Sequence, residues 1–258
     1  MGNGLLDSSG TSQFELEKYG KIRDIVVAWY QRNYLEHEIE DFDFDLSERE
    51  GRLKLVLLGV FFNCIFQEIK AFRLFGEMEK AGYLEFQELA SFEGNLKKTM
   101  RKLEAETGNS WKILKVQAMV DSVKSLQIIF SQEGDIEGII KAKGINYTIN
   151  YLYERLSGVK AKLLWICREC KDRYNIPDAY CYIPDSHVNK FLVNIGFLDR
   201  YRIFSLEECL HISKRMSVFL GNQYFDLPYM RYHQEMCKQC ESGNMQKCQI
   251  NCRLSREK

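Results

Sequence analysis

Apolar residues recur at helical spacing along most of the chain. In the segment 14–36, Ile22, Val26 and Tyr30 stand four residues apart, which places them on one face of an amphipathic helix. The segment 53–66 is apolar on nearly all sides, and this indicates a helix buried at the centre of the fold. No segment alternates convincingly between apolar and polar residues, and all three prolines lie beyond residue 176. The pattern predicts an all-α protein.

Local start and stop signals divide the rest of the pattern into further helices. We expect them at 88–106, 111–130, 135–140, 187–197 and 206–220, and on both sides of a tight turn at Ser157–Gly158 within 145–174. Capping boxes, in which a serine stands three residues before a glutamate, predict helix starts at Ser12, Ser47 and Ser205.

The same pattern suggests two helical lobes. Residues 1–46 hold the first helix and an acidic connection, and we expect them to pack on the second lobe. Residues 47–175 form a helical barrel lobe, and residues 176–258 hold the remaining helices and a cysteine-rich tail. The segment 36–50 carries eight carboxylates; we interpret it as a solvated connection, with a metal or basic-partner site as the alternative.

The charge balance limits the class of partner. The chain has 36 Lys and Arg against 36 Asp and Glu, which argues against a globally basic nucleic-acid-binding protein and leaves a local basic patch. No run approaches the roughly 18 consecutive apolar residues of a membrane helix. The amino terminus also lacks the basic-then-apolar order of a signal peptide. We therefore expect a cytoplasmic protein with no membrane partner.

Cysteine usage indicates a metal site. Four of the nine cysteines stand in the order Cys237-x2-Cys240-x7-Cys248-x3-Cys252. A disulfide framework is disfavoured in a chain without a secretion signal. Four thiolates within 16 residues suit an iron–sulfur cluster or a tetrahedral structural zinc ion.

Two further features are weak evidence of a functional site when each is taken alone. The turn in LSGVKAK is followed by Lys160 and Lys162, and such a corner can direct backbone N–H groups at an anion such as phosphate. Asp185 stands as an N-cap in IPDSHV, where its carboxylate would be held at the start of a helix. A plain helical hairpin with a surface lysine, and an ordinary cap, are the structural alternatives.

Taken together and in this order, these segments resemble the helix-hairpin-helix DNA glycosylases of the endonuclease III superfamily. The hairpin motif of that family, LPGVGxK, is matched at Leu156, Gly158, Val159 and Lys162, and its VDxHV motif at Asp185, His187 and Val188. The chain departs from the family by carrying Ser157 for the proline and Lys160 for the second glycine. Its cysteine spacing also differs from the C-x6-C-x2-C-x5-C of the family.

The resemblance implies a DNA N-glycosylase with AP-lyase activity and a helix-hairpin-helix motif at 146–173. Lys162 would attack C1′ of a flipped nucleotide, and Asp185 would stabilise the positive charge that develops on the sugar. A [4Fe-4S] cluster would be held by the four tail cysteines, with structural zinc as the alternative. The DNA contacts are assigned to Gly158, Lys160, His187, Phe61 and Asn63.

The resemblance also implies a monomer associated with the nucleoid. Two other functions stay open at this point. One is a metal-stabilised nucleic-acid-binding protein without catalysis. The other is an N-glycosidase that acts on RNA or on a modified nucleoside.

Overall fold

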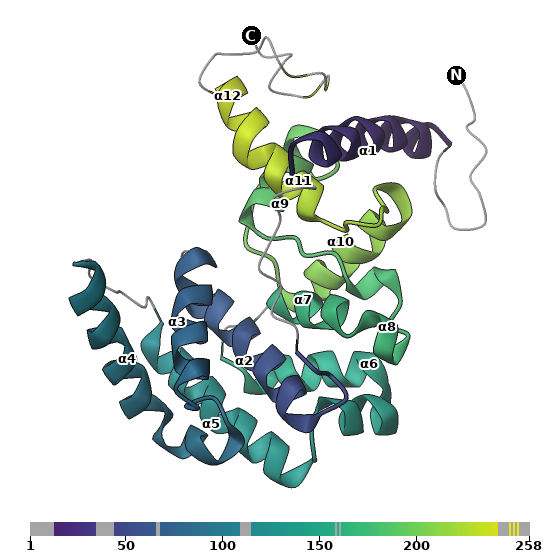
Figure 1. Cartoon of the computed structure of the whole chain (residues 1–258). Helices are drawn as coiled ribbons and strands as arrows, with labels where there is room; N and C mark the ends of the chain where they lie inside the picture. The colour runs from purple at the N-terminus through teal and green to yellow at the C-terminus, as the bar shows by residue number, and fades with distance from the viewer. Residues whose placement is uncertain are drawn as a thin grey trace. The chain divides into compact units, whose positions relative to one another are not determined.

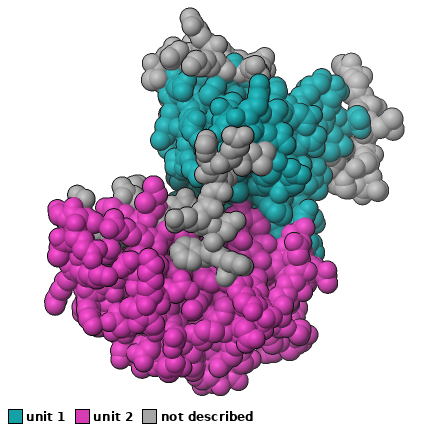
Figure 2. Space-filling model, viewed as in Figure 1, with its two compact units in different colours: residues 1–41, 177–258 teal, residues 42–176 magenta. Residues whose placement is uncertain are grey.

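The described part of the chain is helical throughout. The computed structural model describes residues 13–34, 44–65, 68–108, 115–157, 159, 161–241, 248, 250 and 252, and all elements within them are helices (Figure 1). The prediction of an all-α protein is confirmed for these residues. The chain forms two compact units: unit 1 comprises Met1–Asp41 with Pro177–Lys258, and unit 2 comprises Phe42–Ile176 (Figure 2).

Unit 2 is built around one buried helix. Its elements are α2 (Arg49–Cys64), α3 (Glu68–Lys80), the 3-10 helix η1 (Phe86–Ser91), α4 (Phe92–Thr107), α5 (Val116–Gln132), α6 (Ile136–Arg155), α7 (Lys162–Glu169) and α8 (Lys171–Tyr174). Helix α2 packs against α3, α5 and α7, and it is buried on nearly all sides, as its apolar sequence predicts. Helix α2 therefore packs directly against α7, the helix that begins with Lys162.

A glycine allows α7 to approach α2 closely. A Cβ atom on Gly59 would lie 3.0 Å from Cδ1 of Ile166, which is tighter than most side-chain contacts. Hydrogen at this position therefore lets the two helices pack face to face. The contact joins the carboxyl-terminal half of α2 to α7.

Several predicted boundaries differ from the observed ones. Helix α2 begins at Arg49 after an N-cap Glu48 that makes no side-chain cap, so the capping box predicted at Ser47 is wrong. The Ser47 hydroxyl instead donates to Asp45 Oδ1. The helices expected at 135–140 and from 145 are joined in α6 across a kink, where Gly144 has φ 80°.

Other sequence signals for helix starts and ends can also be compared with the observed helices. Ser205 and Glu208 form the predicted capping box. Gly108 ends α4 in the left-handed region, at φ 65°. The box at Ser12 lies outside the described residues. Helix α3 was not anticipated by the sequence pattern.

Unit 1 joins the first helix of the chain to the last ones. Its elements are α1 (Gln13–Tyr34), the 3-10 helix η2 (Asp178–Tyr180), α9 (Ser186–Asn194), α10 (Leu206–Phe219), α11 (Leu227–Tyr232), the π-helix η3 (His233–Cys237) and α12 (Lys238–Glu241). Helix α1 packs on α10 and α11, and α9 packs on α11 and η3. Of the helices described in both units, none is long and apolar enough to cross a membrane.

Candidate functional site

Lys162 opens α7, directly after the turn that follows α6. The turn is held at both ends, because Leu156 and Val159 are fully buried in unit 2. The backbone N–H of Lys162 donates to the carbonyl of Val159 at 2.9 Å. Gly158 and Lys160, the two residues expected to contact phosphate, lie outside the described residues.

The side chain of Lys162 lies on an aromatic cluster at the end of α2. Its Nζ atom is 5.8 Å from the ring centre of Phe62. The Phe62 ring meets Trp165 and Phe72 edge-on, with centroids 5.1 and 4.8 Å away. Lys162 is half-buried, and no carboxylate of the described residues lies within ion-pair distance of its amine. The amine is therefore close to aromatic surface and is not held by a counter-ion from this part of the chain.

The two α2 residues predicted to contact DNA have different surroundings. Phe61 is fully buried and packs edge-on against Phe75 and Phe92, so its side chain belongs to the core. Its neighbour Phe62 is the aromatic residue beside Lys162. Asn63 is half-buried, and its Nδ2 atom is buried without a hydrogen-bond partner. The Asn63 side chain lowers the pKa of the neighbouring Cys64 thiol, and it stands one residue from the Phe62 contact of Lys162.

Asp185 caps α9 in unit 1, as the sequence predicts. Its Oδ1 atom accepts hydrogen bonds from the backbone N–H groups of His187 and Val188, both at 2.8 Å. No described residue donates a hydrogen bond to Oδ2. One carboxylate oxygen is therefore used to fix the helix start, and the other is left for a further contact. Lys162 and Asp185 belong to different units.

The ring of His187 pairs with a second histidine. Its Nδ1 atom lies 3.2 Å from Nδ1 of His233, which is almost fully buried in η3. Burial lowers the pKa of both imidazoles, and it brings the pKa of His233 to about 4. Both rings are therefore neutral near pH 7, and a DNA contact by His187 would use its other ring nitrogen.

The four tail cysteines lie close enough to influence one another. Cys237, Cys240 and Cys252 are buried, and Cys248 is half-buried. Burial raises the pKa of the Cys237 thiol to about 12, the Asn194 side chain beside it lowers that pKa, and the other three thiols raise it further. Within the described residues, however, no three metal-binding side chains converge tightly enough to hold an ion.

The surroundings of these cysteines nevertheless fit a thiolate-bound metal. The Nδ2 atom of Asn194 is buried and makes no hydrogen bond of ordinary geometry, although it acts on the Cys237 thiol. The Tyr232 hydroxyl lies 3.6 Å from Cys248 Sγ. Polar hydrogens directed at sulfur are typical of metal–thiolate centres. The donor set, its burial and this unsatisfied amide therefore suit iron–sulfur or zinc.

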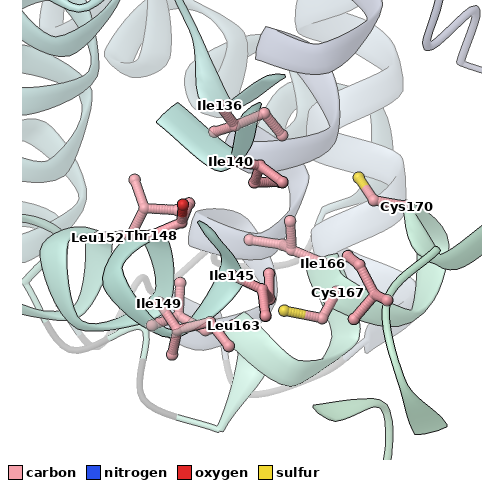
Figure 3. A pocket seen from close by; sticks show the side chains of 11 residues that line it. Ile136, Ile140, Ile145, Thr148, Ile149, Leu152, Leu163, Ile166, Cys167 and Cys170 are labelled. Carbon is pink, nitrogen blue, oxygen red and sulfur yellow. The ribbon is translucent and has the colours of Figure 1, made fainter. Parts of the chain in front are cut away.

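Unit 2 also contains an apolar cavity beside the α6–α7 hairpin. Its volume is about 20 Å³, enough for about one water molecule. The hydroxyl of Thr148 donates to the Gly144 carbonyl, so the lining offers little to a polar ligand. The side chains that point into the space include Ile140, Ile145, Leu163, Ile166, Cys167 and Cys170 (Figure 3). The cavity is too small and too apolar to receive a nucleobase.

Three residues near these sites were missed by the sequence analysis. His233 pairs with His187 across 46 residues, and neither spacing nor composition indicates that contact. Asn194 lies in the helix expected at 187–197 with no chemistry assigned, and Tyr232 lies outside the expected helices. The one available signal was that Tyr232 and His233 stand five and four residues before Cys237, the first of the tail cysteines.

Comparisons of the chain with models of protein families, with curated proteins and with solved structures give no match.

Proposed function

We propose that this chain is a DNA N-glycosylase with AP-lyase activity, which removes a damaged or modified base and then nicks the strand. The amine of Lys162 attacks C1′ of a flipped nucleotide, the C1′–N bond breaks, and its electron pair leaves with the base, which takes up a proton. Loss of the amine proton and opening of the sugar ring give an imine. β-Elimination from the imine expels the 3′ phosphate.

The surroundings of Lys162 carry this proposal. A nucleophilic amine must be unprotonated, and a carboxylate partner would hold it as ammonium. No carboxylate of the described residues lies within ion-pair reach of the Lys162 amine, and its Nζ atom is 5.8 Å from the ring centre of Phe62. Phe62 and Trp165 are both partly exposed, and aromatic faces of this kind can stack on an unpaired base. These features support a site for a flipped nucleotide beside Lys162.

Asp185 supplies the charge that the reaction needs. A carboxylate near the sugar stabilises the oxocarbenium character that develops as the base leaves. The cap to α9 fixes Asp185 through Oδ1, and Oδ2 remains for the substrate.

In this proposal the turn between α6 and α7 is a helix-hairpin-helix motif. Backbone N–H groups at Gly158 and the charge of Lys160 would contact a DNA phosphate, and the buried anchors Leu156 and Val159 would fix the turn. Asn63, whose Nδ2 atom is buried, is assigned to the nucleotide or to its unpaired partner base.

The four tail cysteines are assigned to a [4Fe-4S] cluster, with structural zinc as the alternative. Either metal would supply no step of the reaction and would fix the carboxyl-terminal tail of unit 1. Elemental analysis of the purified protein for iron, sulfide and zinc distinguishes the two.

Borohydride trapping on a panel of damaged oligonucleotides tests the function. We expect wild-type protein to form a covalent adduct with at least one duplex substrate, and Lys162→Gln to form none, because no primary amine remains at the site. Lys124→Gln, which removes an exposed lysine of α5 in the same unit, is the matched control and should trap normally.

Other outcomes would favour the rival functions. Tight DNA binding without base release or adduct would indicate a binding protein that lacks catalysis. Release of base from RNA or from a free nucleoside, but not from duplex DNA, would indicate an N-glycosidase of a different substrate class. Normal trapping by Lys162→Gln would assign the nucleophile to another residue.

A further inference from the structure

Two side chains outside the cysteine motif interact with its thiols. Asn194 is the last residue of α9, and Tyr232 is the last residue of α11. Both elements belong to unit 1, and α9 packs on α11 and η3. The two residues therefore approach the cysteines from helices that precede the tail.

Asn194 carries a buried donor that lacks an acceptor. Its Nδ2 atom is buried and has no hydrogen-bond partner, which is unfavourable for an amide N–H. The Asn194 side chain lowers the pKa of the Cys237 thiol, which burial raises. A neutral thiol is a weak acceptor, whereas a metal-bound thiolate is a strong one. The amide is thus placed to be satisfied when Cys237 loses its proton to solvent and binds a metal.

Tyr232 makes the corresponding contact with Cys248. Its hydroxyl lies 3.6 Å from Sγ, and the Cys248 thiol donates to the Ile250 carbonyl at 3.8 Å. A metal-bound sulfur has no proton, so Cys248 could then only accept, and the tyrosine hydroxyl would be the donor. The ring of Tyr232 is nearly fully buried and meets Trp29 edge-on, with the centroids 5.0 Å apart. Its hydroxyl is therefore held in place by packing.

We infer that Asn194 and Tyr232 are positioning residues of the metal centre, donating hydrogen bonds to the thiolates of Cys237 and Cys248. The inference rests on the four-cysteine site proposed above. Hydrogen bonds to the ligands of a metal stabilise the charged sulfur and orient it, and losing one weakens metal binding by roughly 10–100-fold. The site therefore consists of more than the four cysteines of the sequence motif.

Chelator competition on the full-length protein tests the inference. The metal present in the purified protein, iron or zinc, is first identified by elemental analysis. Asn194→Asp keeps the size of the side chain but replaces the donor by an oxygen that repels thiolate, and Tyr232→Phe removes the hydroxyl alone. We expect the affinity for that metal to fall about 10-fold or more in each variant. Tyr19→Phe, whose hydroxyl bonds the Gly196 carbonyl in the same unit, is the matched control.

A second measurement separates ligand orientation from a loss of folding. Urea unfolding of the metal-free proteins should give wild type and Tyr232→Phe similar stability, because the contact with sulfur is weak until the thiolate forms. If wild-type protein carries metal and both variants bind that metal with an affinity within about twofold of wild type, the inference is overturned and the four-cysteine site stays intact. If wild-type protein contains neither iron nor zinc, both this inference and the proposed four-cysteine site are overturned.

Discussion

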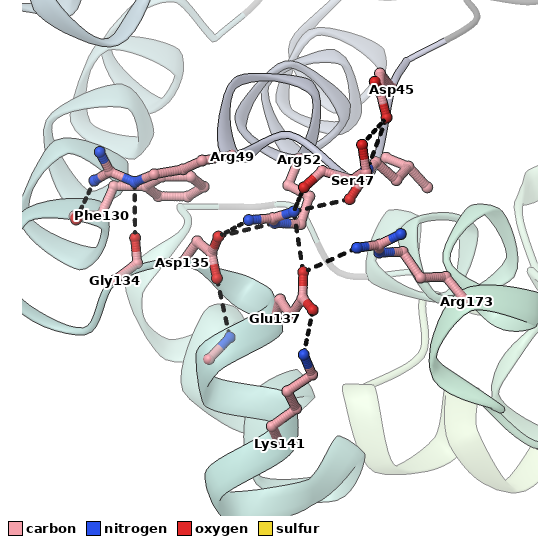
Figure 4. Close-up of polar contacts among 12 residues, drawn as sticks. Asp45, Ser47, Arg49, Arg52, Phe130, Gly134, Asp135, Glu137, Lys141 and Arg173 are labelled. Carbon is pink, nitrogen blue, oxygen red and sulfur yellow. Dashed lines mark hydrogen bonds and ion pairs between the residues drawn. The ribbon is translucent and has the colours of Figure 1, made fainter.

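Arg52 and Asp135 form a buried ion pair, with the guanidinium Nε 2.8 Å from the carboxylate Oδ2 (Figure 4). Asp135 also caps α6 by accepting from the Gly138 N–H at 2.9 Å. Arg52 Nη1 donates to the carbonyls of Leu46 and Ser47. One pair thus ties α2 to the start of the helix that leads to Lys162.

Breaking this pair should strongly destabilise unit 2. In Arg52→Met the carboxylate of Asp135 stays buried without its partner, and we expect the free energy of unfolding to fall by roughly 3–5 kcal/mol. Lys97→Met removes an exposed partner of Glu93 in the same unit and should change stability by less than about 0.5 kcal/mol. Urea unfolding compares the two variants. Equal effects would contradict the structural role given to the buried pair.

The same pair is a contact that the sequence alone does not predict. The apolar run of α2 and the caps at Asp185 and Ser205 depend on neighbouring residues, and each was predicted. Arg52 and Asp135 stand 83 residues apart, so only the tertiary fold brings them together. The same holds for the pairing of His187 with His233.

The predicted cap at Ser47 fails for a related reason. A serine three residues before a glutamate favours a capping box, but tertiary contacts compete for both side chains. Glu50 Oε1 accepts from the backbone N–H of Phe86, and the Ser47 hydroxyl donates to Asp45. The candidate site behaves likewise: the sequence indicates Lys162 and Asp185, while the aromatic surroundings of Lys162 depend on packing.

Stability should decrease in acid because of His233. Its pKa falls from the ordinary 6.5 to about 4, through burial first and then repulsion from His187, Lys190 and Lys238, with Asp185 acting in the opposite direction. The unfolded chain takes up the proton near pH 6.5, whereas the folded chain does so only near pH 4. The stabilisation is therefore complete above pH 6.5 and is lost as the pH falls toward 4.

We expect this group alone to remove about 2 kcal/mol of stability between pH 7 and pH 5. Urea unfolding at several pH values measures the effect. His233→Gln should flatten that part of the pH profile, and the exposed His211→Gln should keep the wild-type slope. A wild-type slope in His233→Gln would assign the acid sensitivity to other groups.

Metal removal should destabilise unit 1. Metal binding by thiolates adds its free energy to folding, so treating the protein with a strong chelator should lower its melting temperature. Cys252→Ser should reduce the metal content and the melting temperature together. Cys209→Ala, which removes a buried thiol of α10 outside the motif, should retain the full metal content. Equal metal content in both variants would contradict the assignment of Cys252 as a ligand.

The two roles assigned to Asp185 can be separated by substitution. Asn is as good an N-cap as Asp, so Asp185→Asn should leave stability almost unchanged, whereas Asp185→Ala loses both bonds to α9 and should cost about 1 kcal/mol. Both changes remove the negative charge. If that charge stabilises the transition state, base release should fall about 100-fold or more in both variants. Single-turnover release from a substrate that wild type processes, measured beside thermal unfolding, gives the two quantities. If Asp185→Asn released base at nearly the wild-type rate and only the less stable Asp185→Ala lost base release, Asp185 would act only as a helix cap.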